Sequence, residues 1–288
     1  MHESGGIGMH PAIRVGPPWW RRVGPGLTGV VAALTVVAIA GGAAAKCLPI
    51  AGLRPGVILA ALPDPGTVRL SYLGHSSFLI ETSGGKSVVT DYNGFVRPAA
   101  MPDIVTMNNA HPSHYTDSVD PEIETVLRGW EPDGSRAVHN LRLDTLNIWN
   151  VPTNVRSFGG VRFNGNSIFV FEAAGLCIAH LGHLHHTLTD SHLDDLGLID
   201  VVLVPVDGSV TMAQELMAQV IEQINPQLVI PMHYFGPSSL ARFLALVEDR
   251  YQVIVAEAST VTLSRVNLPY RKVLVLPPRQ AYSPFSDD

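Results

Sequence analysis

The chain has 288 residues, 46% of them hydrophobic and 15% charged, which is enough for one sizeable folded domain and a short appendage. Its formal net charge of −6 argues against a nucleic-acid-binding protein, which would carry a clustered basic surface. Its only two cysteines, Cys47 and Cys177, exclude a four-cysteine zinc site and allow at most one disulfide.

The first 46 residues have the order of an export signal. Arg21 and Arg22 precede an uncharged run at 27–45, rich in Gly and Ala, which ends in three alanines. The run is also near the length that spans a bilayer, so cleavage after Ala45 and an uncleaved membrane anchor both remain open. We therefore expect an exported protein, either periplasmic or anchored in the inner membrane and facing outward, with membrane association through this segment.

The rest of the chain divides into a Pro- and Gly-rich linker (47–66), a folded domain (67–277) and a C-terminal tail (278–288). Short apolar runs between glycine turns predict strands at 68–73, 77–80, 87–90 and 104–107, followed by a short helix at 121–128. A second series predicts strands at 145–151, 167–172, 176–179, 200–205, 228–231 and 252–255, and helices at 211–224 and 238–248. Two β-rich halves that each contain helices indicate a layered α/β fold.

Histidines follow the ends of three of these predicted strands. His111 and His114 come after 104–107, His183 after 176–179, and His233 after 228–231. Neutral imidazole is the commonest protein ligand for metals, and loops at strand ends can aim several side chains into one cleft. A lone histidine of this kind would be better explained as a hydrogen-bonded structural residue. For the set of four, we predict a shared metal ion.

Several motifs occur in an order that resembles a known family. They are YLGHSSFLI (72–80), Thr90-Asp91, NSIFVFE (166–172), AHLG (179–182), Pro205-Val206 and PMHY (231–234). This order resembles the metallo-β-lactamase superfamily, and within it the branch of ascorbate-6-phosphate lactonase and the phospholipase D that acts on N-acyl-phosphatidylethanolamine. The resemblance covers roughly residues 68–236. It implies an α/β (α+β) fold, a four-layer αββα sandwich with the metal site at one edge of two sheets.

The family's HxHxDH loop is altered in this chain. Asn109 stands at its first histidine and Ser113 at its aspartate, while His183 falls on the family's metal-bridging aspartate and Asn154 on a further histidine. Two close dications repel each other strongly unless carboxylates neutralise them, and both carboxylates that bind the metals in the family are replaced here. We therefore predict one divalent ion, zinc first, with iron, nickel or copper open and a second metal disfavoured.

Further residues are candidates for supporting roles. Asp91 stands where the family uses an acid to orient a ligand histidine, and with the metal-bound water and His186 it forms the predicted catalytic set. His75 is expected to hydrogen-bond beneath the site. The candidates for substrate contact are Asn109, Ser113, Asn154, His75 and His185.

Together these observations predict a metal-dependent hydrolase that uses metal-bound hydroxide on a small-molecule lactone, amide or phosphoester. If three histidines bind and water takes the fourth position, the ion lowers the pKa of that water to about 7. If four histidines close the shell, the site is structural or serves storage. The alternatives are therefore a non-catalytic metal-binding or sensing protein that retains the fold, and a scaffold without metal. The sequence does not indicate the oligomeric state.

Overall fold

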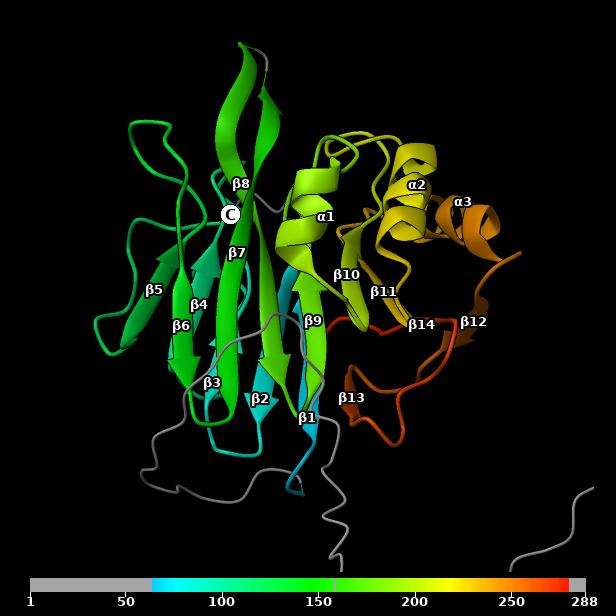
Figure 1. The fold of residues 1–288 in the computed structure, drawn as a ribbon, viewed down its shortest axis with the longest axis horizontal. Coiled ribbons are helices and arrows are strands. Elements are labelled where there is room, and N and C mark those ends of the chain that lie inside the picture. Colours follow the sequence, from blue (N-terminus) through cyan, green and yellow to red (C-terminus); the bar gives the residue numbers. More distant parts are fainter. Residues whose placement is uncertain (1–63, 158, 280–288) are drawn as a thin grey trace, which may run out of the picture. The chain divides into compact units, whose positions relative to one another are not determined.

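The computed structural model describes residues 64–157 and 159–279 (Figure 1). The predicted export signal, nearly all of the predicted linker and most of the C-terminal tail lie outside these ranges. Within the described ranges, no helix combines the length and hydropathy needed to cross a bilayer.

Strands in the described part of the chain form two mixed sheets. The six-stranded sheet has the order β13-β1-β2-β3-β4-β5. Its strands are β1 (Val68–Gly74), β2 (Ser77–Thr82), β3 (Ser87–Val89), β4 (Ile104–Met107), β5 (Thr125–Arg128) and β13 (Thr260–Leu263). The eight-stranded sheet has the order β12-β14-β11-β10-β9-β8-β7-β6. Its strands are β6 (Asn140–Leu143), β7 (Leu146–Ser157), β8 (Gly160–Ala173), β9 (Leu176–His180), β10 (Val201–Pro205), β11 (Leu228–Met232), β12 (Gln252–Val255) and β14 (Lys272–Val275).

The two sheets pack face to face through an apolar core. Leu70 and Phe78 of the six-stranded sheet belong to the same buried cluster as Ile148, Phe171 and Leu203 of the eight-stranded sheet. Every residue of β9, β10 and β11 is buried. Parallel strands that are covered on both faces have a continuously apolar sequence. For this reason these strands could be recognised in the sequence as short apolar runs.

Three helices cover the outer face of the eight-stranded sheet (Figure 1): α1 (Asp190–Leu196), α2 (Gln214–Ile224) and α3 (Pro237–Val247). Met217 and Val220 of α2 and Phe243 of α3 are buried in one cluster with sheet residues. The outer face of the six-stranded sheet is covered differently. There, Tyr92, Val96 and Ile123 of connecting loops are buried against β3 and β4, and no helix of the described residues takes part.

One prediction about secondary structure is wrong, and several elements were not predicted. The expected helix at 121–128 is a turn followed by β5, whose residues 125–128 pair in parallel with β4. The two β-branched residues Thr125 and Val126 gain backbone hydrogen bonds from a neighbouring strand, and this pairing overrides the local helix signal. The elements without a sequence prediction are α1, β6, β13 and β14.

The same edge of both sheets carries the loops that matter for function. The parallel strands β9, β10 and β11 end at residues 180, 205 and 232, and β3 and β4, also parallel, end at 89 and 107. Parallel strands present their carboxyl ends at one edge, so the residues that follow them converge there. The turn between β1 and β2 contributes His75 from the antiparallel side of the six-stranded sheet.

Candidate metal centre

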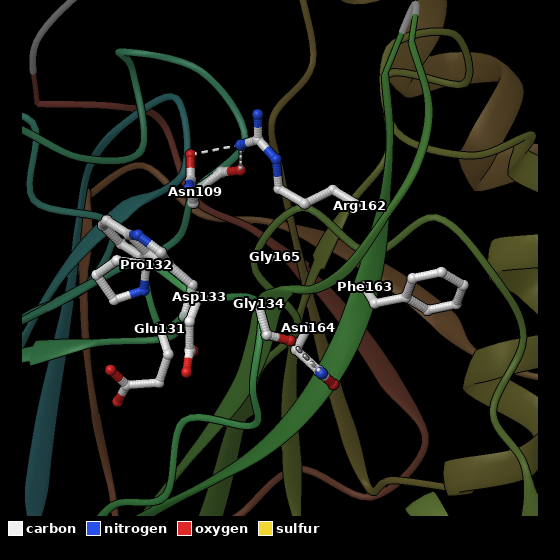
Figure 2. Close-up of a pocket in the computed structure, with 10 residues that line it drawn as sticks. Asn109, Glu131, Pro132, Asp133, Gly134, Arg162, Phe163, Asn164 and Gly165 are labelled. Atoms are coloured by element: carbon white, nitrogen blue, oxygen red, sulfur yellow. Dashed lines mark hydrogen bonds between the residues drawn. The ribbon is translucent and has the colours of Figure 1, made fainter.

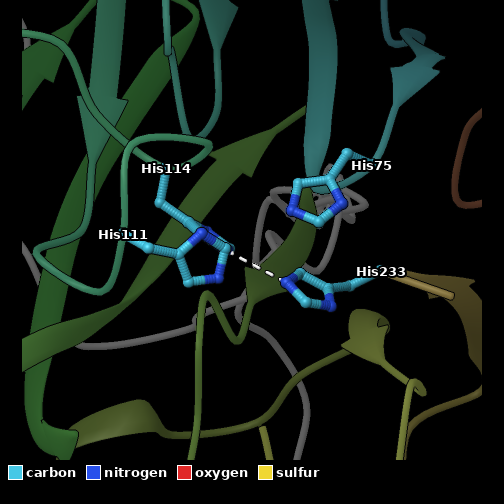
Figure 3. A group of neighbouring side chains, drawn as sticks. All are labelled: His75, His111, His114 and His233. Atoms are coloured by element: carbon cyan, nitrogen blue, oxygen red, sulfur yellow. Dashed lines mark hydrogen bonds between the residues drawn. The ribbon is translucent and has the colours of Figure 1, made fainter. Parts of the chain in front are cut away.

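Histidines from both sheets meet at this edge (Figure 3). One ligand atom each from His75, His111, His114 and His233 lies within 4.8 Å of all the others. His183 adjoins this group, because its Nε2 lies 3.0 Å from His111 Nε2. All of these residues are buried except His111, which is half-buried. The four predicted ligands are thus brought together, and His75 lies among them as well.

Two carboxylates face the outer nitrogens of two of these rings. Asp91 Oδ2 lies 2.6 Å from His114 Nδ1, and Asn108 donates to the other Asp91 oxygen at 3.0 Å. Asp207 Oδ1 lies 3.3 Å from His233 Nδ1, an ion-pair distance rather than an aligned hydrogen bond. Thr211 Oγ1 donates to the same Asp207 oxygen at 2.5 Å. In their ionised form, carboxylates at these positions favour a proton on Nδ1 of each ring and so fix the tautomer.

This tautomer leaves the inner nitrogens as acceptors that face each other. Nε2 of His114 and Nε2 of His233 lie 3.1 Å apart. With both protons on Nδ1, two lone pairs meet with no hydrogen between them, which is unfavourable without a cation. Zinc–nitrogen bonds of about 2.0–2.1 Å in a tetrahedral shell place neighbouring ligand nitrogens at a comparable separation. The donor set therefore fits a divalent ion.

Hydrogen bonds also distinguish His183 from His75. Ser113 Oγ lies 2.7 Å from His111 Nδ1 and 2.8 Å from His75 Nε2. If His111 offers Nε2 to the ion, its Nδ1–H donates to Ser113, and the hydroxyl proton then goes to His75 Nε2. His75 would keep its own proton on Nδ1 and would have no lone pair left for a metal. His183 Nδ1, by contrast, can donate to His185 Nε2 at 2.7 Å and leave its Nε2 free.

Burial keeps the imidazoles of His75, His111, His114 and His183 neutral well below physiological pH. Desolvation, reinforced by neighbouring histidines, lowers the pKa of His75 to about 2 and that of His111 to about 4. The same causes hold the pKa values of His114 and His183 far below their ordinary range. Neutral rings offer lone pairs, so these four histidines can bind a cation without first losing protons.

Asp91 and Asp207 differ in their electrostatics. Burial raises the pKa of Asp91 to about 8, against the opposing effect of hydrogen bonds from Asn108 and Ser76. Burial also favours the neutral form of Asp207, but the adjacent His233 ring and hydrogen bonds from Thr211 and the Ser209 amide outweigh it and hold the pKa below its ordinary range. Asp207 is therefore a stable carboxylate, and a cation at the histidine cluster would favour the carboxylate of Asp91 as well.

We expect the metal-free protein to lose stability in mild acid. The unfolded chain binds protons at His75, His114 and His180 below pH 6.5, whereas the folded pKa values are about 2, far below 6.5 and about 4, respectively. The free energy of unfolding should therefore fall from pH 6.5 toward pH 4 by about 1.4 kcal/mol per pH unit for each such histidine. The raised pKa of Asp91 acts in the opposite direction and offsets about one histidine.

Urea unfolding in chelator at pH 7.5, 6 and 5 measures this loss, and the same series with saturating zinc should show a smaller one. An unfolding midpoint in chelator that stays constant from pH 7.5 to 5 would show that the cluster is not buried as described.

The site holds strained backbone at three functional positions. His75, Asp91 and His233 all have positive φ, at 52°, 44° and 53°. Left-handed conformations of this kind cost about 1 kcal/mol or more for residues with a side chain. Two hydrogen bonds to the His75 carbonyl help to hold this arrangement: Tyr72 Oη donates at 2.8 Å and the backbone amide of His233 at 2.7 Å.

The remaining candidates have distinct positions. Ser113 lies between His111 and His75, where it orients rings instead of supplying a carboxylate. The Asn109 side chain is bound by Arg162 Nη1 at 2.6 Å. His185 contacts His183, and its Nδ1 is buried without a hydrogen-bond partner among the described residues. His185 therefore stays a candidate for substrate contact.

His186 and Asn154 interact with each other rather than with the cluster. The Asn154 amide donates to His186 Nε2 at 3.1 Å, and His186 Nδ1 lies 2.8 Å from the Thr187 carbonyl oxygen. Asn154 Oδ1 also accepts from the Asn164 amide at 3.1 Å. These contacts occur at the irregular pairing of β7 with β8, so both residues shape that hairpin in the structure. Their predicted catalytic and substrate roles stay predictions.

Sequence reasoning gave no role to two residues that the structure brings to the site. Asp207 follows β10 by two residues, so the rule that found the histidines, a polar residue just past a buried strand, also indicated its place. Its contact with His233 depends on where the neighbouring strand ends. The contact of Arg162 with Asn109 joins residues 53 positions apart and has no local signal.

Comparisons with known proteins agree with this architecture. Residues 69–233 match the family model of the beta-lactamase superfamily domain. A UPF0173 metal-dependent hydrolase of Thermococcus kodakarensis is 26% identical over 226 residues, which cover 66% of this chain and 96% of the relative. A UPF0173 metal-dependent hydrolase of Pyrococcus abyssi is 28% identical over 218 residues, covering 65% and 96%.

Two solved structures resemble this one. A Thermotoga maritima protein, provisionally designated a Zn-dependent hydrolase of the metallo-beta-lactamase superfamily, has a TM-score of 0.53 at 28% identity, covering 73% of this chain and 98% of its own. A metallo hydrolase of Ignicoccus hospitalis has a TM-score of 0.52 at 22% identity, covering 69% and 99%. The metallo-β-lactamase fold is confirmed as two packed mixed sheets, but the described residues hold no helical layer outside the six-stranded sheet, so they do not form the predicted four layers. The narrower branch within the superfamily stays a prediction.

Proposed function

Because the chain belongs to the beta-lactamase superfamily, we propose that it is a metal-dependent hydrolase acting on a small-molecule lactone, amide or phosphoester. One observation carries this proposal. His114 and His233 direct their Nε2 atoms at each other across 3.1 Å, while carboxylates face their outer nitrogens. This arrangement suits a shared cation, and relatives with the same fold are designated metal-dependent hydrolases.

The side chains of the site have complementary tasks in this reaction. A bound divalent ion would acidify a water molecule, the nucleophile in metal-assisted hydrolysis. Asp91 and Asp207 hold protons on the outer nitrogens of His114 and His233, so both rings keep their lone pairs directed inward. Ser113 fixes the ring of His111 through its Nδ1. All proposed ligands are neutral, so they leave the charge of the ion undiminished for polarising water.

We further propose one ion per chain, with zinc as the first choice. Neither Asn109 nor Ser113 supplies the negative charge that a pair of close dications requires. Imidazole ligands suit zinc, and the Thermotoga maritima relative carries a zinc-dependent designation.

The second candidate is a metal-binding or sensing protein without catalysis. The contact of His183 Nε2 with His111 Nε2 at 3.0 Å favours it, because a fourth imidazole could complete a tetrahedral shell and exclude water. The two candidates differ in whether one coordination position stays open.

Metal analysis and turnover test the proposal together. Purified without chelator, the protein should contain one metal per chain and should cleave at least one of dihydrocoumarin, 4-nitroacetanilide and bis(4-nitrophenyl) phosphate. Chelation should abolish turnover, and added zinc should restore it. Bound metal with no turnover on any of these substrates would favour the non-catalytic candidate, and absence of bound metal would refute both.

We also propose that the protein acts outside the cytoplasm, on the basis of the sequence order at 21–45. Cell fractionation of the native host tests this proposal. A full-length chain that begins at Met1 and remains in the cytoplasmic fraction would contradict it.

A further inference from the structure

A pocket of about 400 Å³ lies beside the histidine loop (Figure 2). One wall is the segment at 130–134, and the other is the start of β8 at 162–165. Asn109 also lines this pocket and precedes His111 by two residues. Two residues span at most about 7 Å of extended chain, so the pocket adjoins the candidate metal centre.

Arg162 is fixed in this pocket by one edge of its guanidinium group. Its Nη1 donates to the side-chain oxygen of Asn109 at 2.6 Å and to the Asn109 carbonyl at 3.0 Å. Its stem crosses Gly165, where a Cβ atom would come within 2.9 Å of Arg162 Cδ. The Asn109 amide in turn donates to the Gly165 carbonyl at 3.0 Å, which joins the two segments. Arg162 is therefore exposed but held in one orientation.

The other edge of the same guanidinium group is open. Among the described residues, no acceptor bonds Nε or Nη2 of Arg162, and no carboxylate lies within 4.0 Å of the group. An Nε–Nη2 edge presents parallel N–H groups that match the two oxygens of a carboxylate. Because the side chain is already oriented, an anion bound there loses less of its interaction energy to ordering.

The facing wall limits the charge that this pocket accepts. Glu131 and Asp133 are exposed on that wall and add negative charge near the pocket, with their carboxylates directed away from Arg162 (Figure 2). Their repulsion increases with the charge of the bound group, whereas the paired hydrogen bonds to Arg162 are available to any carboxylate. A singly charged carboxylate is therefore favoured over a doubly charged phosphate monoester.

On this geometry, and building on the proposed hydrolase activity, we propose that Arg162 binds a carboxylate of the substrate. The substrate class is then a small ester, lactone or amide with a free carboxylate a few bonds from the cleaved bond. Arg162 is a specificity residue here, and Asn109 positions its guanidinium group.

A binding measurement tests this site without any turnover. Butyrate, butyramide and inorganic phosphate are titrated into the zinc-loaded full chain and followed by the Arg162 Nε–H resonance, assigned by its loss in Arg162→Gln. We expect butyrate to shift this resonance and to bind about tenfold more weakly to Arg162→Gln. Butyramide should cause no shift. Equal butyrate affinity in both proteins would overturn the proposal, as would tighter binding of phosphate than of butyrate.

Kinetics on a matched substrate pair give the second readout. For the mono-4-nitrophenyl ester of glutaric acid, Arg162→Gln should raise KM about tenfold with little change in kcat, while 4-nitrophenyl pentanoate should be unaffected. The control is Arg142→Gln on β6, an exposed arginine outside the pocket. An equal loss on both esters, or a lower metal content, would mean that Arg162 only supports the histidine loop.

A third variant tests the acidic wall, and the outcomes separate this site from the reaction itself. Glu131→Gln combined with Asp133→Asn should strengthen phosphate binding relative to butyrate, and an unchanged ratio would refute the role of the acids. Arg162-dependent butyrate binding without turnover of any ester would refute the hydrolase and leave the carboxylate site standing. Turnover without a preference for the carboxylate ester would support the hydrolase and refute the carboxylate site.

Discussion

Replacing His114 with alanine should lower zinc affinity at least 100-fold. His114 belongs both to the four ligands predicted from the sequence and to the group of closest ligand atoms. It is fully buried, and its Nδ1 lies 2.6 Å from Asp91 Oδ2. Loss of the ring removes a ligand and leaves the Asp91 carboxylate without its partner. Competition with a chromophoric zinc chelator measures the affinity, and elemental analysis gives the stoichiometry.

Two further variants make this result specific. Asp91→Asn keeps the ring of His114 but weakens its orientation, and should cost about 10–100-fold in affinity. His192→Ala is the control, because this histidine caps α1 and is not part of the cluster. Circular dichroism establishes that each variant is folded. Folded His114→Ala protein with unchanged zinc affinity would refute the site.

Comparison of His183→Gln with His75→Gln should identify the fourth ligand. The group of closest ligand atoms includes His75, whereas the sequence predicted His183. The positions of the protons favour His183 as the ligand. The Ser113 hydroxyl can donate to Nε2 of His75, whereas His183 can donate from Nδ1 to His185 and keep the lone pair of its Nε2 for the ion. We therefore expect His183→Gln to lower zinc affinity at least tenfold more than His75→Gln does.

The coordination shell gives an independent reading of the same pair. X-ray absorption of the zinc-loaded variants should show one imidazole fewer in His183→Gln than in the unmodified protein, and an unchanged number in His75→Gln. The opposite pattern would assign the position to His75 and would mean that the Ser113 hydroxyl accepts from both rings. Equal loss in both variants would indicate a five-histidine shell.

The sequence predicted which residues meet at the site better than it predicted the hydrogen bonds and ion pairs between their side chains. Buried parallel strands have apolar sequences, so β4, β9 and β11 could be located from the sequence. The residues just past these strands could therefore be identified as neighbours at one edge of the sheets. Asp91 could be predicted as a partner of a ligand histidine only through the family resemblance. The contacts of Asp207 with His233 and of Ser113 with two rings depend on side-chain positions across separate loops, which no local pattern encodes.

Errors in the secondary-structure prediction had similar causes. Residues 121–128 carry a proline and an acidic start typical of a helix, but pairing with β4 decides the conformation of 125–128. The middle of the β7–β8 hairpin is polar and contains Pro152, Asn154 and Gly165, so it resembles loop sequence. Its pairing is irregular between Thr153 and Val155. The wall of the pocket at 162–165 therefore lies in a part of β8 that the sequence did not predict as a strand.

The histidines come from both halves of the sandwich: His111 and His114 follow a strand of the six-stranded sheet, and His183 and His233 follow strands of the eight-stranded sheet. An ion held among them would fasten one sheet to the other, much as a covalent cross-link does. At a free zinc concentration 1,000 times the dissociation constant, this fastening would stabilise the folded chain by about 4 kcal/mol. If the chain acts outside the cytoplasm, as we propose, its lifetime against proteases would then depend on the zinc supply of its surroundings.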